Sequence, residues 1–149
     1  SSLDELANGE FKRVIGEVDA IDPKKVTRVV LCCGKVYYDL VAARREKKIT
    51  NIAIVRVEQL YPFPKDALQV ELAKYPKATE IVWTQEEPRN QGAWYWIASR
   101  HHLDSEMGVK QKLLLVSRPA SSSPAVGYLA KHNEQQKALI ESALGKIEH

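Results

Sequence analysis

Four short apolar runs place the strongest constraint on how this chain can fold. They occupy residues 29–33, 52–57, 81–83 and 113–116, and they lack the polar alternation of a half-buried strand. Strands that cover one face of a sheet alternate apolar and polar residues, whereas strands buried on both faces do not. The runs therefore predict an α/β fold, a three-layer αβα domain whose mostly parallel sheet has about five strands.

Segments with helical periodicity separate these runs. After Gly34, apolar residues recur three and four positions apart and end in a basic cluster at residues 44–48, which suits the carboxyl end of a helix. Pro64 suits the first position of a second helix. Two more helices are expected within residues 94–101 and 125–144.

The composition argues against two classes of partner. Lys and Arg number 22 against 19 Asp and Glu, and the resulting net charge of +3 is too small to predict nucleic-acid binding. No apolar run approaches the roughly 18 residues that a membrane span needs, so no membrane partner is predicted. The acidic, polar first ten residues do not resemble a signal or transit peptide.

Residues 1–25 differ from the regular pattern that begins at Val26. Ser2 and Glu5 fit a capping box for a short helix, and residues 10–25 alternate loosely before the turn signal Asp22-Pro23. We expect residues 1–25 to be a lead-in or linker from a preceding domain, with a short helix and an edge strand. Residues 26–149 are then the α/β domain proper, and the chain is expected to be cut from something longer.

The polar loop of residues 85–92 lies between the third run and the tryptophan-containing helix. Pro88 disfavours the helical region for Glu87, so the strand is expected to end in a loop there, with Asn90 as the N-cap of the next helix. The loop is either a solvated connection or a binding element. Trp94 and Trp96 are two positions apart on the helix and cannot both face one core, so one of them is expected to cover a partner surface.

Ligands of parallel sheets bind beyond the carboxyl ends of the strands, and basic residues stand at those ends here. Lys35 and Arg118 follow apolar runs directly, and we expect them to bind a regulatory nucleotide phosphate together with Arg56 or Arg89. This cluster requires the four strands to be parallel and neighbouring. The alternative is that Lys35 and Arg118 form ordinary ion pairs with carboxylates of nearby turns, or with absent domains. Those carboxylates are Glu58, Glu86 and Glu87.

Other reactive side chains predict no catalytic residue and no metal site. Cys32 and Cys33 are adjacent, so they point to opposite faces of a strand, and we expect buried free thiols in a reducing cytoplasm. The remaining candidates lack the spacing of a phosphate loop, a shared-proton carboxylate pair, a zinc site or a serine nucleophile. These candidates are the segment CCGKVYY, Glu86-Glu87, His101-His102 and residues 121–123.

Four motifs in a fixed order resemble the C-terminal region of the E1 component of 2-oxoglutarate dehydrogenases. They are GKVYYDL, AIVRVEQLYPFP, EEPRNQGAW and RPASSSPAVGY, at residues 34–40, 53–64, 86–94 and 118–128. The similarity also includes the opening SSLDELANG and covers nearly the whole chain. Each motif is weak alone, but four in register are specific. The chain thus resembles the transketolase C-terminal-like domain of that family, with residues 145–148 close to the natural end and His149 either native or a tag remnant.

The resemblance implies the activity of a parent enzyme. That family decarboxylates 2-oxoglutarate on thiamine diphosphate with Mg²⁺ and passes the succinyl group to a lipoyl arm of the E2 component. Its C-terminal domain braces the preceding domains of the same chain, joins the homodimer contact and, in some members, helps bind AMP or acetyl-CoA. The family's GDG diphosphate motif does not occur in this chain. The chain alone is therefore expected to bind no cofactor and to be inactive.

Two classes of function stay open for the chain on its own. One is a stand-alone regulatory domain that binds a nucleotide, and the other is a purely structural assembly domain. The resemblance implies a cytoplasmic location if the source is bacterial, or the mitochondrial matrix if it is eukaryotic.

Overall fold

The computed structural model describes residues 14–58, 64–88, 91–94, 112–118 and 128–147. A five-stranded sheet in the order β1-β3-β2-β4-β5 forms its centre. The strands β2, β3, β4 and β5 run parallel, and β1 pairs antiparallel with β3 at one edge. Their bounds are Val14–Ile15 for β1, Arg28–Cys32 for β2, Ile52–Val57 for β3, Glu80–Pro88 for β4 and Lys112–Arg118 for β5. The predicted α/β fold with a mostly parallel sheet of about five strands is confirmed.

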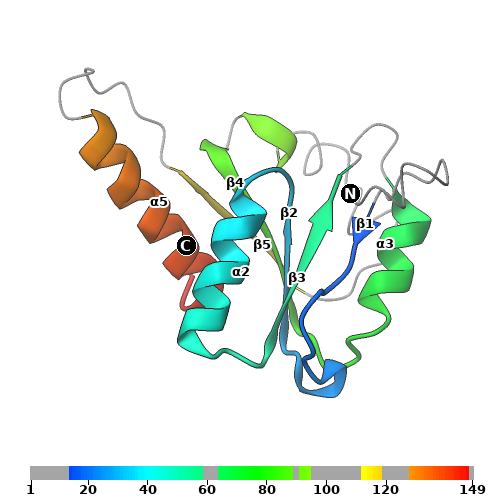
Figure 1. Ribbon diagram of the computed structural model, residues 1–149. Helices are drawn as coiled ribbons and strands as arrows, with labels where there is room; N and C mark the ends of the chain where they lie inside the picture. Colours follow the sequence, from blue (N-terminus) through cyan, green and yellow to red (C-terminus); the bar gives the residue numbers. More distant parts are fainter. Residues whose placement is uncertain (1–13, 59–63, 89–90, 95–111, 119–127, 148–149) are drawn as a thin grey trace, which may run out of the picture.

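Helices cover both faces of this sheet (Figure 1). The helices α2 (Val36–Lys47) and α5 (Tyr128–Leu144) pack on one face, and α3 (Lys65–Leu72) packs on the other. Pro64 is the N-cap of α3 and not its first helical residue, one position from the prediction. A 3-10 helix, η1 (Pro23–Lys25), precedes β2 and carries Asp22 as its N-cap, in agreement with the turn predicted there.

The core has two apolar layers, one on each side of the sheet, because successive strand residues point to opposite faces. Leu31 and Trp83 face α3, whereas Val30 and Val82 face α2 and α5, and all four are fully buried. Burying such side chains stabilises the fold by about 1.5–3 kcal/mol each. The absence of polar alternation in the sequence therefore follows from two covered faces.

The strand β4 is longer than the sequence predicts. It continues through Glu87 to Pro88, where Pro88 pairs with Arg118 of β5 after a register shift. The prediction that the strand ends in a loop at Glu87 is therefore wrong. On its other side β4 pairs with β2 only as far as Cys32. Beyond that point β4 has one neighbouring strand, and proline is tolerated where a strand has a free side.

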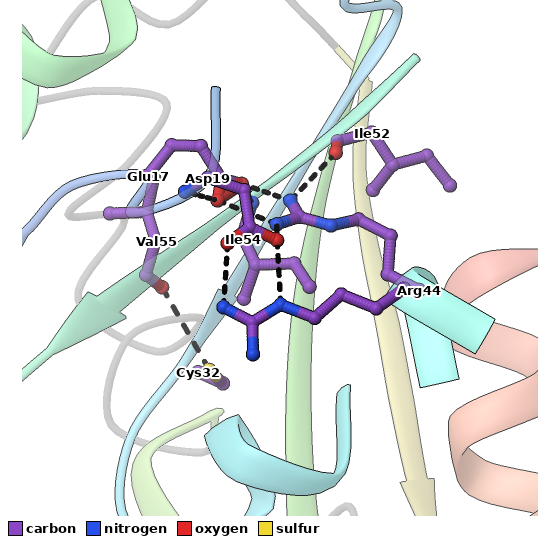
Figure 2. Close-up of polar contacts among 8 residues, drawn as sticks. Glu17, Asp19, Cys32, Arg44, Ile52, Ile54 and Val55 are labelled. Carbon is purple, nitrogen blue, oxygen red and sulfur yellow. Dashed lines mark hydrogen bonds and ion pairs between the residues drawn. The ribbon is translucent and has the colours of Figure 1, made fainter. Parts of the chain in front are cut away.

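Beyond the short strand β1, side chains form hydrogen bonds with the backbone of the edge of β3. Val14 and Ile15 form the edge strand that the sequence predicts. Glu17 then accepts a hydrogen bond from the backbone nitrogen of Ile54 at 3.0 Å, and Arg44 of α2 donates one to the carbonyl of Ile52 at 3.1 Å (Figure 2). Polar backbone groups of β3 are thus satisfied by a carboxylate and a guanidinium in place of a longer strand.

Arg44 is a buried polar side chain at this edge of the sheet. It is 2% exposed and forms ion pairs with Glu17 and, at 2.8 Å, with Asp19. Asp19 also pairs with Arg45 at 2.6 Å. Residues 14–25 therefore contact the domain closely, and the boundary after residue 25 stays a prediction.

Candidate functional site

A hollow of about 540 Å³ opens at the carboxyl edge of the sheet between α2 and α5. The condition set for a cluster at this edge is met, since β3, β2, β4 and β5 are neighbours and parallel. Most of the residues that line the hollow are polar or charged, and their charges are of both signs. Its lining comprises Lys35, Tyr38, Asp39, Glu86, His132, Asn133, Gln136, Lys137 and Ile140.

Arg118 contacts several of the residues that line this hollow. Its guanidinium contacts Nδ1 of His132 at 2.8 Å, the side-chain carbonyl of Gln136, and Oε2 of Glu86 at 3.5 Å. Gln136 in turn donates to Oδ2 of Asp39 at 2.9 Å. One side chain of β5 thereby connects β4, α5 and α2. Arg118 thus forms an ion pair with Glu86, one of the carboxylates named in the ion-pair alternative.

Lys35 lies at the rim of the hollow, at the amino end of α2. It is the exposed N-cap residue, and no side chain caps the helix there. Backbone N–H groups at a helix start carry partial positive charge and favour an anion. Lys35 therefore has the position expected of it, beside a hollow and next to a helix N-terminus.

Arg56 does not line the hollow itself but contacts Tyr38, which does. Its guanidinium forms an ion pair with Glu58, donates to the hydroxyl of Tyr38 at 3.2 Å, and lies 5.2 Å from the ring centroids of Tyr37 and Tyr38. These contacts hold Tyr38 in the lining. Arg89, the fourth residue of the predicted set, lies outside the described residues.

The loop after β4 is organised by Gln85, a role that the sequence does not reveal. Gln85 is 3% exposed, and its amide nitrogen donates to the carbonyls of Glu87, Pro88 and Gln91 at 2.9–3.0 Å. Its side-chain oxygen accepts from the indole of Trp83 at 3.0 Å and from the backbone nitrogen of Trp94 at 2.9 Å. This side chain serves the protein's own backbone and is not available to a ligand. The expected N-cap Asn90 and the second tryptophan, Trp96, lie outside the described residues.

Sequence reasoning missed the helical residues of the lining. Positions 35, 38 and 39 share one face of α2, and positions 132, 133, 136 and 137 share one face of α5, by the three- and four-residue spacing of a helix. That spacing was available as a signal. It does not tell which two helices face each other, and Gln136 and Asp39 are 97 positions apart.

Of the other reactive residues, the two cysteines are described, whereas His101, His102 and residues 121–123 lie outside the described residues. Both cysteines are free thiols; Cys32 is buried as expected, whereas Cys33 is only half-buried. Burial raises the pKa of the Cys32 thiol well above its usual range. Among the described residues, no three His, Cys, Asp or Glu side chains are grouped to hold a metal ion. No helix in the same part of the chain is long and apolar enough to cross a membrane.

The sheet, its helices and the charged hollow define the chain as a three-layer parallel α/β domain with a polar site at the carboxyl edge. Residues 1–144 match the family model described as 2-oxoglutarate dehydrogenase C-terminal. The chain belongs to this family.

Curated relatives agree with the family match. The chain is 54% identical over 147 residues to the 2-oxoglutarate dehydrogenase E1 component of Cupriavidus necator, a match that covers 99% of this chain and 15% of that protein. It is 55% identical over 144 residues to the protein of the same name from Haemophilus influenzae, covering 97% of this chain and 15% of that protein. The chain therefore spans about 15% of the length of the relatives it matches.

Proposed function

We propose that this chain is the C-terminal domain of a 2-oxoglutarate dehydrogenase E1 component, an oxidoreductase of the tricarboxylic acid cycle. The observation that carries the proposal is identity above 50% across nearly the whole chain to proteins with that name. The parent decarboxylates 2-oxoglutarate and transfers the succinyl group to the lipoyl group of the E2 component. The domain serves packing against the preceding domains of its own chain and dimerisation of E1.

The parent's cofactors, thiamine diphosphate and Mg²⁺, are proposed to bind outside this chain. No GDG diphosphate motif occurs in the sequence, and the described residues hold no grouped metal ligands. No step of the reaction is assigned to these residues, and catalysis is proposed to take place in the rest of the parent. Because the relatives named above are bacterial, the parent is proposed to work in the cytoplasm.

The parent's substrate choice tests this assignment. The full-length protein that contains this segment, supplied with thiamine diphosphate and Mg²⁺, should turn over 2-oxoglutarate far faster than pyruvate in an assay with an artificial electron acceptor. Reconstitution with E2 and E3 should then give NADH formation from 2-oxoglutarate. Turnover of another 2-oxo acid in preference to 2-oxoglutarate would overturn the proposal.

A regulatory anion site, for AMP or acetyl-CoA, is proposed at the carboxyl edge with Lys35, Arg56, Arg89 and Arg118. The hollow beside Lys35 supports it, since Lys35 and Lys137 line a space of about 540 Å³ at a helix start. Arg118 and Arg56 act mainly by holding the lining, because Glu86 and Glu58 already pair with them. A phosphate group is proposed to lie nearest Lys35 and Lys137.

Nucleotide titration of the parent separates this proposal from plain structural roles. Lys35→Ala should weaken AMP or acetyl-CoA binding about tenfold, as expected for the loss of roughly 1.4 kcal/mol from a charge-assisted contact. Arg118→Ala should weaken it as well, by releasing Glu86, His132 and Gln136. The matched control is Lys24→Ala on η1, an exposed lysine outside the lining. If Lys35→Ala and Arg118→Ala keep the wild-type affinity for AMP and acetyl-CoA and an unchanged circular dichroism spectrum, these residues have a structural role only.

A further inference from the structure

The first turns of α2 present an aromatic ring and an ammonium group to the hollow at the carboxyl edge. Lys35, Tyr38 and Asp39 line it together, because positions three and four apart share one face of a helix. Lys137 of α5 lines the same hollow. Among the described residues, the side chains of Lys35 and Lys137 have no ion-pair or hydrogen-bond partner. Both ammonium groups are therefore available to an anion.

Tyr38 carries an exposed ring whose orientation is fixed. The residue is 60% exposed, yet Arg56 donates a hydrogen bond to its hydroxyl at 3.2 Å. The guanidinium of Arg56 also lies over the ring, 5.2 Å from its centroid, and the ring of Tyr37 packs edge-on at a centroid distance of 5.4 Å. Arg56 is itself held by an ion pair with Glu58. Because the ring of Tyr38 is oriented before a ligand arrives, less conformational entropy is lost on binding.

The cation covers one face of the Tyr38 ring and leaves other ring surface open. Arg56 occupies a single face in a cation–π contact. Since most of Tyr38 is nevertheless exposed, the remaining ring surface is open to the hollow that the residue lines. An open aromatic surface favours another planar ring, in an offset-stacked or edge-to-face arrangement. Nucleobases stack on aromatic side chains in this way, because every base has a π face.

The groups around the ring suit a nucleotide better than a plain anion or an uncharged aromatic compound. Lys35 and Lys137 offer two ammonium groups to a phosphate. Asn133 of α5 carries an amide, which can both donate and accept hydrogen bonds along the edge of a base. The volume of about 540 Å³ lies within the usual range for small-molecule sites. Cations for a phosphate, an amide for a base edge and a fixed ring for a base face thus occur together.

We propose that Tyr38 is a stacking platform for the purine ring of a nucleotide bound in this hollow. The inference rests on the proposed anion site, where Lys35 and Lys137 bind the phosphate, and adds the residue that recognises the base. A purine buries a larger planar face than a pyrimidine and gains more from the contact. The hollow thereby distinguishes a nucleotide from a sugar phosphate, which the two lysines alone cannot do.

Three ligands separate the base from the phosphate: AMP, ribose 5-phosphate and adenosine. In calorimetric titration, the 149-residue chain should bind AMP about tenfold more tightly than ribose 5-phosphate, as expected for one stacked base. Tyr38→Ala should remove this advantage and leave the affinity for ribose 5-phosphate unchanged, whereas Tyr38→Phe should keep most of it. Lys35→Ala should weaken AMP and ribose 5-phosphate by the same factor. The control Val70→Ala, at another exposed apolar residue, should change neither affinity.

Stacking also has a spectroscopic signature that needs no substitution. When AMP or adenosine binds to the unsubstituted chain, the ring protons of adenine should shift upfield in the proton NMR spectrum, because they enter the ring current of Tyr38. The shift should disappear in Tyr38→Ala.

Three results would overturn the inference. They are equal affinity of the unsubstituted chain for AMP and ribose 5-phosphate, an AMP advantage that persists in Tyr38→Ala, and equal weakening of both ligands by that substitution. In each case ribose 5-phosphate still binds and the proposed anion site stands. Adenosine binding with the upfield shift, but no binding of ribose 5-phosphate, would refute the anion site and support the platform. No binding of any of the three ligands would refute both.

Discussion

At the scale of single residues, the side-chain amide of Gln85 stabilises the loop that follows β4. Among the described residues it makes five hydrogen bonds, to backbone atoms of Glu87, Pro88, Gln91 and Trp94 and to the indole of Trp83. Each amide atom is saturated, so no shorter or charged side chain can replace it. The next residue in the chain, Glu86, faces the hollow and contacts Arg118, so this loop also places part of the site.

Replacing Gln85 tests this role. Gln85→Ala should lower the free energy of unfolding by roughly 2–4 kcal/mol, because buried donors and acceptors left unsatisfied cost about 1–3 kcal/mol each and only partly add. Urea denaturation followed by tryptophan fluorescence measures the change. Gln135→Ala on α5 is the control and should shift stability by no more than about 0.5 kcal/mol. A loss in Gln85→Ala as small as in the control would contradict the role.

At the scale of elements, the contact between the segment after β1 and α2 is polar and buried. Arg44 reaches Glu17 and Asp19 across more than twenty positions of sequence, and Glu17 also binds the backbone of Ile54 (Figure 2). A buried charge that loses its partner is costly, whereas a pair replaced as a whole by apolar side chains often is not. The two kinds of variant therefore have different expected results.

Glu17→Ala should destabilise the chain by about 3–5 kcal/mol, since it leaves Arg44 uncompensated and the Ile54 nitrogen without an acceptor. Adding Arg44→Met should recover part of that loss. Equilibrium denaturation of both variants and of the control Glu46→Ala, an exposed position of α2, gives the comparison. If the double variant is less stable than Glu17→Ala, charge compensation is not the reason for the loss.

The same cluster predicts an acid-sensitive contribution to stability. The hydrogen bond from Arg45, together with Arg44, lowers the pKa of Asp19 from 3.8 to about 2. A carboxyl group with a lowered pKa in the folded state stabilises the fold above its unfolded pKa and loses that contribution as the pH falls. The free energy of unfolding should therefore decrease between about pH 4 and pH 2, and Asp19→Asn should remove this part of the slope. Parallel profiles for both proteins in this range would be the contrary result.

At the scale of the whole molecule, the described residues form a five-stranded sheet with helices on both faces, and the chain spans only about 15% of the length of its relatives. The sheet and its two apolar layers supply the requirements of an independent fold. Surfaces that meet the rest of a parent are then exposed. Large apolar side chains are exposed on the helices and on the segment after β1: Val18 at 57%, Tyr38 at 60%, Val70 at 67% and Leu129 at 73%.

The isolated chain should melt cooperatively, and thiamine diphosphate with Mg²⁺ should leave the midpoint unchanged. A ligand that binds the folded state must raise stability, and the cofactor's binding residues are proposed to lie elsewhere in the parent. Calorimetry with and without cofactor decides the point. A rise of several degrees would show that the chain carries cofactor-binding residues of its own.

Self-association at high concentration is the second expectation for the whole chain. Exposed apolar side chains that a larger protein would cover favour contacts between copies. Sedimentation velocity should show a concentration-dependent rise in the weight-average coefficient, reduced in Leu129→Lys or Val70→Lys. A strictly monomeric chain at millimolar concentration would refute it.

The sequence by itself determined the class of fold and the edge of the sheet at which the candidate site lies. Apolar runs such as residues 52–57 encode burial on both faces, because an exposed face would have required polar alternation. Helical periodicity located α2 and the later part of α5, and the position of Lys35 directly after a run placed it at the carboxyl edge. These features are local, since each depends on residues a few positions apart.

Only the tertiary structure decided which side chains meet. Arg118 contacts Glu86 because β5 lies beside β4, and Gln136 reaches Asp39 because α5 lies beside α2. Burial of Arg44 likewise depends on Glu17, 27 positions away. Strand order and helix contacts depend on the free energy of the whole folded chain. They therefore cannot be predicted from a short stretch of sequence.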